Sequence, residues 1–571
     1  MIQFRKCYNN LFDLVIKNAK IIDGTGSPSF IGDIAIEDGV IVNRGNNLGA
    51  SKLVVDAKGL TLVPGFIDSH THYDAQLTWD PWANPSPKLG VTTVVIGNCG
   101  FTIAPCKPEH RELTIRNLTN VEGMSLDALR KGIVWNFETF PEYLNFLEER
   151  GVGPNVAAYV GHSSVRVYVM GEDALTRTAT NDEILEMEKI VKESMISGGL
   201  GFATSTFEGH NGENGVPMPS RLADNKEMHN LIMAMASFGR GVFMLTRGSN
   251  TSIDNIQKWM EGSNRPAIVA ALLHNPLSDN STFKVLADIS EATDKGTEMW
   301  GQVSCRPLSM EFTMKSPYLF EGIHSWRPAM ECTSLGIYKK VLAENNFRRN
   351  LSKEIENDAQ VRLFNGDWDK IIVREVQNNK YKNLEGQSLK DIAKAENVKP
   401  LDWLLDHSLK ENGMNTLFIA MLLNNDEEAV GKLLQHPRSN ITLSDAGAHL
   451  TFFNDAGYGL YMLKKWVKEN KIMSIEEAIY NLTGKQADIY RIDQRGRLVP
   501  GQYADMMLID PDEIDVSQSY RVNDLPGGSS RLNIDGHGIH GVWINGNKVL
   551  DETNIINSKK LPGKVIRGFH A

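Results

Sequence analysis

The stretch Leu62-Val63-Pro64-Gly65-Phe66-Ile67-Asp68-Ser69-His70-Thr71-His72 is the most informative part of this 571-residue chain. An apolar, extended run ends there in two histidines that are two residues apart. Side chains two apart on a strand point to the same side, so one metal ion can contact both rings. The stretch therefore predicts a buried strand whose carboxyl end carries metal ligands.

Similar apolar runs recur along the middle of the chain and alternate with amphipathic helical stretches. One such helix is expected from Asn181 to Ser197, capped by Thr180 or Asn181. This alternation is typical of βα units with a parallel sheet, and eight runs predict a (β/α)8 TIM-like barrel. The eight strands are expected near residues 63–68, 91–97, 155–161, 200–205, 241–246, 267–273, 298–304 and 440–445.

The two ends of the chain have a different pattern, in which short β-branched runs are separated by glycine turns. Asn545-Gly546 is a strong hairpin signal of this kind. We expect residues 1–62 and 496–571 to combine into a small β-sandwich domain. Residues 63–495 would then form the barrel domain, with a charged, helical insertion at about 306–439 between the seventh and eighth strands.

The composition is that of an ordinary globular protein, with 41% hydrophobic and 23% charged residues. With 60 basic and 70 acidic residues the formal net charge is -10, which argues against binding to nucleic acid or to an anionic membrane. No apolar run approaches the roughly 18 residues of a membrane span. The five cysteines are scattered and the amino terminus has no secretory pattern, so we expect a cytoplasmic protein.

Catalytic side chains of parallel barrels lie at the carboxyl ends of the strands. The residues expected there include several with polar or metal-binding side chains: His70, His72, Cys99, His162, Thr246, Arg247, His274 and Asp445. Residues 209–215, a glycine-rich segment that contains His210, are interpreted as an active-site loop. The chain has no Walker or Rossmann motif, so a nucleotide site is not expected.

Read together, six segments resemble the D-aminoacylase (N-acyl-D-amino-acid deacylase) branch of the amidohydrolase superfamily. They follow the order of that branch and are spread over nearly the whole chain, which makes the combination specific. The segments are Pro64-Gly-Phe-Ile-Asp-Ser-His-Thr-His72, Gly90-Val-Thr-Thr-Val-Val-Ile-Gly-Asn-Cys-Gly100, Val160-Gly-His-Ser-Ser-Val-Arg166, Ser197-Gly-Gly-Leu-Gly-Phe202, Ser444-Asp-Ala-Gly447 and Gly496-Arg-Leu-Val-Pro-Gly-Gln-Tyr-Ala-Asp505.

The resemblance implies a metal-dependent hydrolase that cleaves an N-acyl amide, a carbon–nitrogen bond, with a metal-activated water. It implies that Asp445 is the catalytic acid and base, and that the metal ligands are His70, His72, Cys99, His274 and Asp445. In this branch the cysteine takes the place of the bridging lysine of other amidohydrolases, and a thiolate suits a divalent cation. Zinc is the expected ion for histidine and cysteine ligands.

Two positions depart from the pattern of the branch. Aligned on Arg247, the usual strand-five histidine becomes Leu245, which cannot bind a metal. One ion is therefore expected, with two divalent ions as the alternative. The lysine that grips a substrate carboxylate after strand six is also absent. We expect substrate contacts instead from a set of other polar side chains: His162, Arg166, Arg247 and His449.

Two rival functions stay open at this point. A cyclic amide hydrolase, acting on a hydantoin-like or lactam ring, would use the same metal centre. A non-catalytic barrel with an eroded metal site is favoured by Leu245, whereas His70, His72 and Asp445 count against it. In the two hydrolytic readings the partner is a small N-acyl or amide molecule, and the resemblance is compatible with a homo-oligomer.

Overall fold

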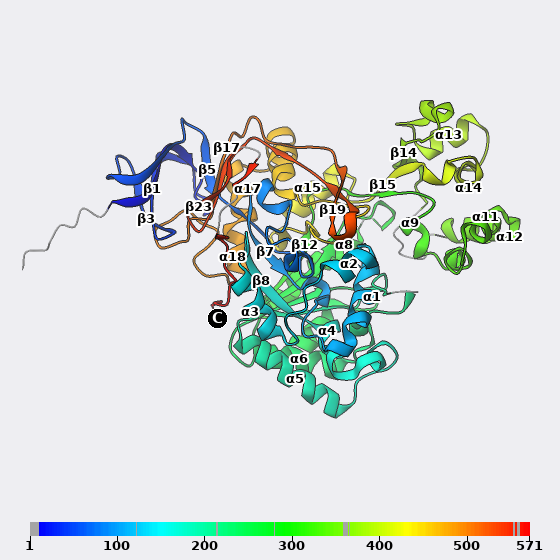
Figure 1. Cartoon of the computed structure of the whole chain (residues 1–571), viewed down its shortest axis with the longest axis horizontal. Coiled ribbons are helices and arrows are strands. Elements are labelled where there is room, and N and C mark those ends of the chain that lie inside the picture. Colours follow the sequence, from blue (N-terminus) through cyan, green and yellow to red (C-terminus); the bar gives the residue numbers. More distant parts are fainter. Residues whose placement is uncertain are drawn as a thin grey trace, which may run out of the picture.

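The computed structural model describes residues 11–121, 123–212, 215–278, 280–357, 364, 366–551, 554–556 and 560–570. Cys7 and residues 213–214 of the expected active-site loop lie outside these ranges. A central barrel separates a β-rich part, built from both chain ends, from an inserted segment on the opposite side (Figure 1).

Eight parallel strands form the central sheet, in the order β16-β12-β11-β10-β9-β8-β7-β6. Their bounds are β6 (Phe66–Asp68), β7 (Val91–Ile96), β8 (Asn155–Gly161), β9 (Gly201–Ser205), β10 (Val242–Thr246), β11 (Ala267–Leu272), β12 (Met299–Val303) and β16 (Ser439–Ile441). The edge strands β6 and β16 are joined just beyond their ends. Asp445 N donates to His70 O (3.1 Å) and His72 N donates to Ala446 O (2.7 Å). The sheet therefore closes into the predicted (β/α)8 barrel.

The eighth strand is shorter than predicted and ends at Ile441 rather than at residue 445. Leu443 and Asp445 adopt φ values of 75° and 54°, in the left-handed region that extended strands do not visit. The backbone therefore leaves the sheet four residues earlier than predicted and turns across the mouth of the barrel.

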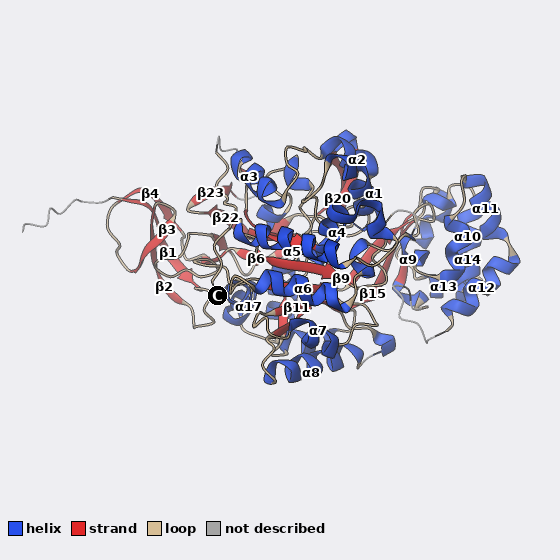
Figure 2. Cartoon of the chain, turned by 90° about the horizontal axis from the view of Figure 1, so that it is seen from below, coloured by secondary structure: helices blue, strands red, loops and turns tan. Residues whose placement is uncertain are grey.

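Helices cover the outside of the barrel (Figure 2). Among them, α5 begins as predicted, because the Thr180 side chain caps its first turn and Glu183 completes a capping box. The barrel helices are α1 (Arg111–Val121), α2 (Leu126–Gly132), α3 (Phe140–Arg150), α4 (His162–Met170), α5 (Asn181–Ile196), α6 (Asn225–Ala236), α7 (Ile253–Met260), α8 (Ser281–Asp294), α15 (Glu427–Gln435), α16 (Tyr458–Tyr461), α17 (Ile475–Leu482) and α18 (Gly484–Ile489).

The two ends of the chain share one nine-stranded mixed sheet. Its centre is the antiparallel pair of β5 with β17, which joins strands from opposite ends of the sequence. The predicted Asn545-Gly546 turn connects β22 to β23. The strands are β1 (Phe12–Ile21), β2 (Phe30–Glu37), β3 (Val40–Gly45), β4 (Ser51–Asp56), β5 (Thr61–Pro64), β17 (Met506–Ile509), β22 (Ile539–Ile544), β23 (Asn547–Asp551) and β24 (Asn554–Ile555).

The segment inserted between β12 and β16 is only partly helical, so the prediction of a helical insertion needs correction. It contains an antiparallel sheet, β13-β15-β14, and has a hydrophobic core of its own. Its elements are β13 (Leu308–Phe312), α9 (Tyr318–Glu321), α10 (Arg327–Met330), α11 (Leu335–Ala343), α12 (Asn345–Ile355), β14 (Ile371–Glu375), α13 (Leu389–Ala395), α14 (Pro400–Leu409) and β15 (Leu417–Leu423). The domain boundaries given above stay a prediction.

Two short strand pairs complete the carboxyl-terminal part: β18 (Asp515–Val516) with β21 (Gly536–His537), and β19 (Tyr520–Leu525) with β20 (Ser529–Asn533). Within the described ranges, none of the helices has the length and apolar character needed to cross a bilayer.

Gly201 provides a test of the packing inside the barrel. It begins β9 opposite Val242 of β10, and a Cβ at this position would lie 1.9 Å from the Val242 carbonyl oxygen. We expect Gly201→Ala to destabilise the fold by about 1–3 kcal/mol or more, because the strand backbones must separate. Thermal and urea unfolding would measure the loss. Gly336→Ala is the control, since no atom lies within 4 Å of its Cβ position in α11; an equal loss there would contradict the explanation.

Candidate metal centre

Three loops at the carboxyl end of the barrel bring the predicted metal-binding side chains together. His70 and His72 follow β6, Cys99 follows β7, and Asp445 follows β16. Cys99 and Asp445 have φ values of 58° and 54°. Such left-handed conformations of non-glycine residues cost about 1–3 kcal/mol and cluster at functional sites. The backbone is therefore strained at the two positions that turn a thiol and a carboxylate toward the histidines.

The donor atoms of these side chains lie at short distances from one another. Cys99 Sγ is 3.6 Å from His70 Nε2 and 3.9 Å from His72 Nε2, and all three atoms lie within 4.8 Å of one another. Asp445 Oδ1 lies 3.5 Å from His70 Nε2 and 3.1 Å from His72 Nε2. The compact set of three donors does not include Asp445, which borders its two imidazoles.

These separations fit a divalent ion. Zinc bonds of about 2.0–2.1 Å to nitrogen or oxygen and about 2.3 Å to sulfur place tetrahedral donors about 3.3 Å (N to O) or about 3.6 Å (N to S) apart. The measured nitrogen–oxygen and nitrogen–sulfur distances lie close to these values. The donor set of two imidazoles and a thiol also suits zinc. His70, His72 and Cys99 would hold the ion, with Asp445 beside it.

The local electrostatics favour the ionised forms of Cys99 and Asp445, which are the forms that bind a metal. Burial raises the pKa of Cys99, but the neighbouring His70 and His72 outweigh it and bring this pKa down to about 7. Burial also raises the pKa of Asp445, and His72, His449 and His70 together hold it well below its usual range. The carboxylate is therefore ionised at neutral pH, and the thiol ionises far more readily than an ordinary cysteine.

A second pair of contacts holds the loops in register. Ser444 Oγ donates to Asp68 Oδ2 (2.5 Å), and Asp68 Oδ1 accepts from the backbone N–H of His70 (3.4 Å). Asp68 ends β6 and Ser444 precedes Asp445, so this carboxylate ties the first strand to the last. The same Ser444 hydroxyl lies 3.3 Å from His70 O.

The strand-five position needs a correction of one residue. Leu245 is fully buried in the hydrophobic core and does not face the donors. Thr246 does, because its Oγ1 lies 3.0 Å from Cys99 Sγ. No imidazole comes from this strand in either register, and a threonine hydroxyl is a weak zinc ligand.

The structure does not bring His274 to the donor set. Its backbone is held by Asn424, whose Oδ1 accepts from His274 N (3.1 Å) and whose N donates to His274 O (2.8 Å). Its ring lies against Phe283, with centroids 6.4 Å apart. The ligand role expected for His274 is therefore not supported by this geometry.

The side chains of His162 and Arg166 lie in the protein interior. Both side chains are fully buried and share one partner, Glu227 of α6. His162 Nε2 lies 2.8 Å from Glu227 Oε1, and Arg166 Nη1 pairs with both oxygens of the same carboxylate. The expected substrate contacts are not supported, because these three side chains form a buried ion-pair network between α4 and α6.

His449 lies at the site and Arg247 near it. His449 Nε2 is 3.6 Å from Asp445 Oδ2, the carboxylate oxygen other than the one nearest His72. Arg247 is half-buried in the loop after β10, where its Nη1 donates to Thr251 O (2.9 Å). Both therefore stay candidates for substrate contact.

Aromatic side chains surround the histidines of the mouth, and they were not predicted from the sequence. Tyr318 of the inserted segment stacks on Phe452 (centroids 4.7 Å apart), and both rings lie near His449. Across the mouth, His210 contacts Phe101 and Phe207. The glycine-rich loop was the available signal for His210, whereas nothing local pointed to Tyr318.

His210 has a neutral ring. Burial is the main cause that lowers its pKa, to about 3, and the nearby His449 adds to the effect. Its Nδ1 lies 2.7 Å from Ser205 Oγ at the end of β9. His210 therefore presents an uncharged polar group at the mouth at neutral pH.

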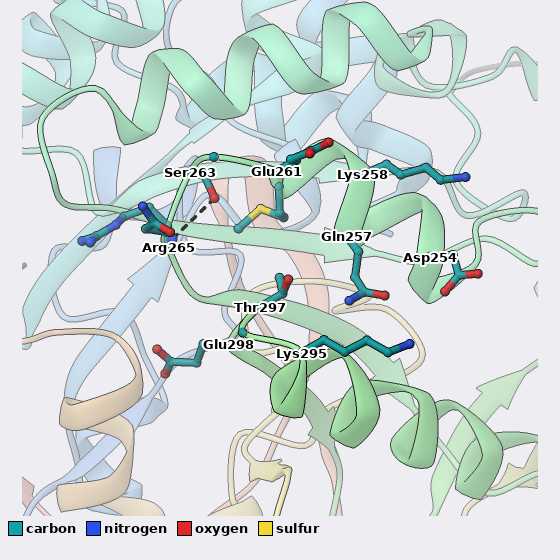
Figure 3. A pocket seen from close by; sticks show the side chains of 13 residues that line it. Asp254, Gln257, Lys258, Glu261, Ser263, Arg265, Lys295, Thr297 and Glu298 are labelled. Carbon is teal, nitrogen blue, oxygen red and sulfur yellow. Dashed lines mark hydrogen bonds between the residues drawn. The ribbon is translucent and has the colours of Figure 1, made fainter.

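A cavity lies at the other end of the barrel. Its volume is about 620 Å³, and it is lined by residues 260–265 before β11 and residues 295–298 before β12 (Figure 3). Strand beginnings and strand ends are on opposite faces of a parallel barrel, so this cavity is separate from the donor set. Its labelled side chains, such as Lys258, Glu261 and Lys295, carry both signs of charge.

The buried network predicts a large stability effect. Glu227→Gln leaves Arg166 buried without its counter-charge, so we expect a loss of about 3–5 kcal/mol in the free energy of unfolding. Urea unfolding would measure it. The control is Glu112→Gln, because Glu112 and its partner Arg130 are both exposed and such pairs contribute about 0–1 kcal/mol. If His162 and Arg166 bound substrate and did not stabilise the fold, the two variants would instead have equal free energies of unfolding.

Comparison with known proteins agrees with this geometry. A profile of the amidohydrolase family matches residues 53–346 and 371–550, which is most of the chain. An N-acyl-D-aspartate deacylase from Alcaligenes xylosoxydans xylosoxydans is 26% identical over 97% of this chain and 95% of its own. An uncharacterised protein of Mycobacterium tuberculosis is 28% identical over 91% of this chain and 88% of its own.

Solved structures share the fold. The N-acyl-D-glutamate deacylase of Bordetella bronchiseptica, determined with zinc and a phosphonate inhibitor, superposes with a TM-score of 0.67. The alignment covers 98% of this chain and all of that one, at 22% identity. Together with the family profile and the donor set at the carboxyl end of the barrel, this shows that the chain belongs to the amidohydrolase family.

Proposed function

We propose that this protein hydrolyses the amide bond of an N-acyl amino acid with the help of one divalent ion. The observation that carries the proposal is the convergence of His70, His72 and Cys99 beside an ionised Asp445 at the catalytic face of the barrel. The relative named N-acyl-D-aspartate deacylase supports N-acyl-D-amino acids as the substrate class.

A divalent ion held by the three donors would lower the pKa of a bound water and polarise the scissile carbonyl. Asp445 is the proton carrier of the reaction. Its carboxylate accepts a proton from the attacking water and returns it to the leaving nitrogen as the C–N bond breaks. The water oxygen stays on the acyl carbon, so the products are a carboxylic acid and an amine.

We further propose that the ion is zinc and that the site holds one ion. A second ion in such a site would draw ligands from the fifth and sixth strands. Thr246 supplies only a hydroxyl there, and the imidazole of His274 is not part of the compact donor set. The donors that remain, two imidazoles and a thiol, suffice for one tetrahedral zinc ion with its fourth position left for water.

The mouth of the barrel would hold the rest of the substrate. Tyr318, Phe452 and the ring of His449 offer an aromatic wall next to Asp445. Arg247 is the cation that we assign to the substrate carboxylate, since a guanidinium binds a carboxylate with two parallel hydrogen bonds. A cytoplasmic location and a homo-oligomer also remain part of the proposal.

Metal analysis tests the centre directly. We expect about one zinc per chain in the wild type. We expect clearly less in Cys99→Ala, because this variant lacks the thiolate ligand of the proposed catalytic ion. Cys106→Ala is the matched control, because Cys106 is equally buried, bonds to Thr114 and has a pKa raised to about 11 by burial. Plasma mass spectrometry of the three proteins gives the answer. Wild-type protein that stays metal-poor after added zinc would rule out the mechanism.

Kinetics test the role of Asp445. Asp445→Asn should lower kcat/KM by about 10²–10⁴-fold, the usual contribution of a general acid–base group. The substrate panel would hold N-acetyl-D- and N-acetyl-L-amino acids, together with hydantoin and lactam rings. Asp493→Asn, an exposed aspartate paired with His570, should behave like the wild type. Ring opening without N-acyl cleavage would favour the cyclic amide reading, and zinc-loaded protein inactive on the whole panel would refute the proposal.

A further inference from the structure

A chain of hydrogen bonds runs through the barrel core beneath His70. Its members are polar side chains that are completely buried, so each one must satisfy its hydrogen-bonding atoms inside the protein. The chain begins in α18, crosses β16 and β12, and reaches the Nδ1 atom of His70. Its members are Gln486, Ser69, Asn440, Tyr490 and Gln302.

The contacts of Gln486 determine which atom donates in each hydrogen bond of the chain. Its Nε2 donates to two backbone carbonyl oxygens, of Asn481 (2.9 Å) and Ile441 (3.1 Å), and a carbonyl oxygen can only accept. Gln486 Oε1 therefore faces Ser69 Oγ, at 2.9 Å. Because an amide oxygen also can only accept, the hydroxyl hydrogen of Ser69 lies on this bond.

The direction passes next to Tyr490. Asn440 Oδ1 is a third acceptor of Gln486 Nε2 (2.6 Å), so one of the two amide hydrogens of Gln486 is shared between two oxygens. This leaves Asn440 Nδ2 to donate to the Tyr490 hydroxyl (3.1 Å). The Ser69 side chain also interacts with the Tyr490 hydroxyl, and because the Ser69 hydrogen is already used, the hydrogen of Tyr490 points toward Ser69. The Tyr490 oxygen can then only accept from Gln302, whose Nε2 lies 2.7 Å away.

The last link decides the state of His70. Because Gln302 Nε2 donates to the Tyr490 hydroxyl, its other amide atom, Oε1, faces His70 Nδ1 at 2.7 Å. An amide oxygen accepts, so in the neutral ring Nδ1 carries the hydrogen and the lone pair is on Nε2. That nitrogen is the one that lies 3.6 Å from Cys99 Sγ and 3.5 Å from Asp445 Oδ1.

We infer that Gln302 is a positioning residue, which the Tyr490 chain orients so that His70 is held as the Nδ1–H tautomer that can bind a metal through Nε2. Metal-bound histidines often have a carboxylate in this position. Here Asp68, Asp445 and the Cys99 thiol are already close to His70, and a neutral amide fixes the same tautomer without a further negative charge. The inference rests on the proposed function only for the use of Nε2.

Two measurements test the inference. Long-range ¹H–¹⁵N spectra of ¹⁵N-histidine protein without metal report which nitrogen of His70 carries hydrogen, and His70→Gln assigns the signal. The spectra are recorded at a pH above the pKa of His70, which burial lowers but Cys99 and Asp445 raise more strongly, so that the ring is neutral. We expect Nδ1–H in the wild type and a loss or mixture of this tautomer in Gln302→Met. Chelator competition should show zinc binding about 10–100-fold weaker in Gln302→Met, the usual cost of losing such a partner.

Three further variants separate positioning from simple destabilisation. Gln302→Glu keeps an acceptor for Nδ1 and should restore the Nδ1–H signal. Tyr490→Phe removes only the hydroxyl that orients Gln302, so it should give mixed tautomers, and it replaces Gln302→Met if that protein does not fold. Gln494→Met, at an exposed glutamine bonded to Gly501 O, should match the wild type in both measurements.

The outcomes distinguish this inference from the proposed function. An Nε2–H tautomer of His70 in the wild type would overturn it, as would an unchanged tautomer and zinc Kd in Gln302→Met or in Tyr490→Phe. Wild-type protein that shows Nδ1–H but binds no zinc would instead overturn the metal centre, while the orientation of His70 by Gln302 would stand.

Discussion

The junction between the first and last strands is the constraint on which the rest of the structure depends. A parallel barrel has to bring its two edges together, and here the backbone of His70 and His72 bonds to that of Asp445 and Ala446. The residues that close the barrel are the same residues that carry the histidines and the carboxylate. Closing the barrel therefore also brings together the side chains of the proposed metal centre, and the hydrogen bond between Asp68 and Ser444 reinforces this junction.

The charges of the site are arranged around this junction. The ionised carboxylate and the acidic thiol are stabilised by the imidazoles, and the imidazoles are in turn stabilised by them. Burying a charge without a partner of opposite charge costs free energy. The cluster is stable because each group that tends to become negative lies beside an imidazole that can carry a positive charge. A cation among these donors meets a carboxylate and a thiol that already lose their protons readily, and little rearrangement is needed to receive it.

Much of this could be predicted from the sequence, because barrel strands are continuous apolar runs and their ends follow directly. His70, His72, Cys99 and Asp445 were found in this way. The strand-five register was missed by one residue, since alignment on Arg247 cannot show which side of β10 faces inward. His162 and Arg166 were misplaced because their partner Glu227 lies about sixty residues away. The sheet of the insertion was missed because its short strands pair across long separations.

The way in which the inserted segment is attached has a consequence for the evolution of the family. Its first and last strands, β13 and β15, pair with each other and close the segment at its base. It packs around its own core and contributes Tyr318 to the barrel mouth. Its length and sequence can therefore drift without moving β12 or β16. Selectivity for new acyl or amine groups can arise in this module while the chemistry beneath it is inherited unchanged.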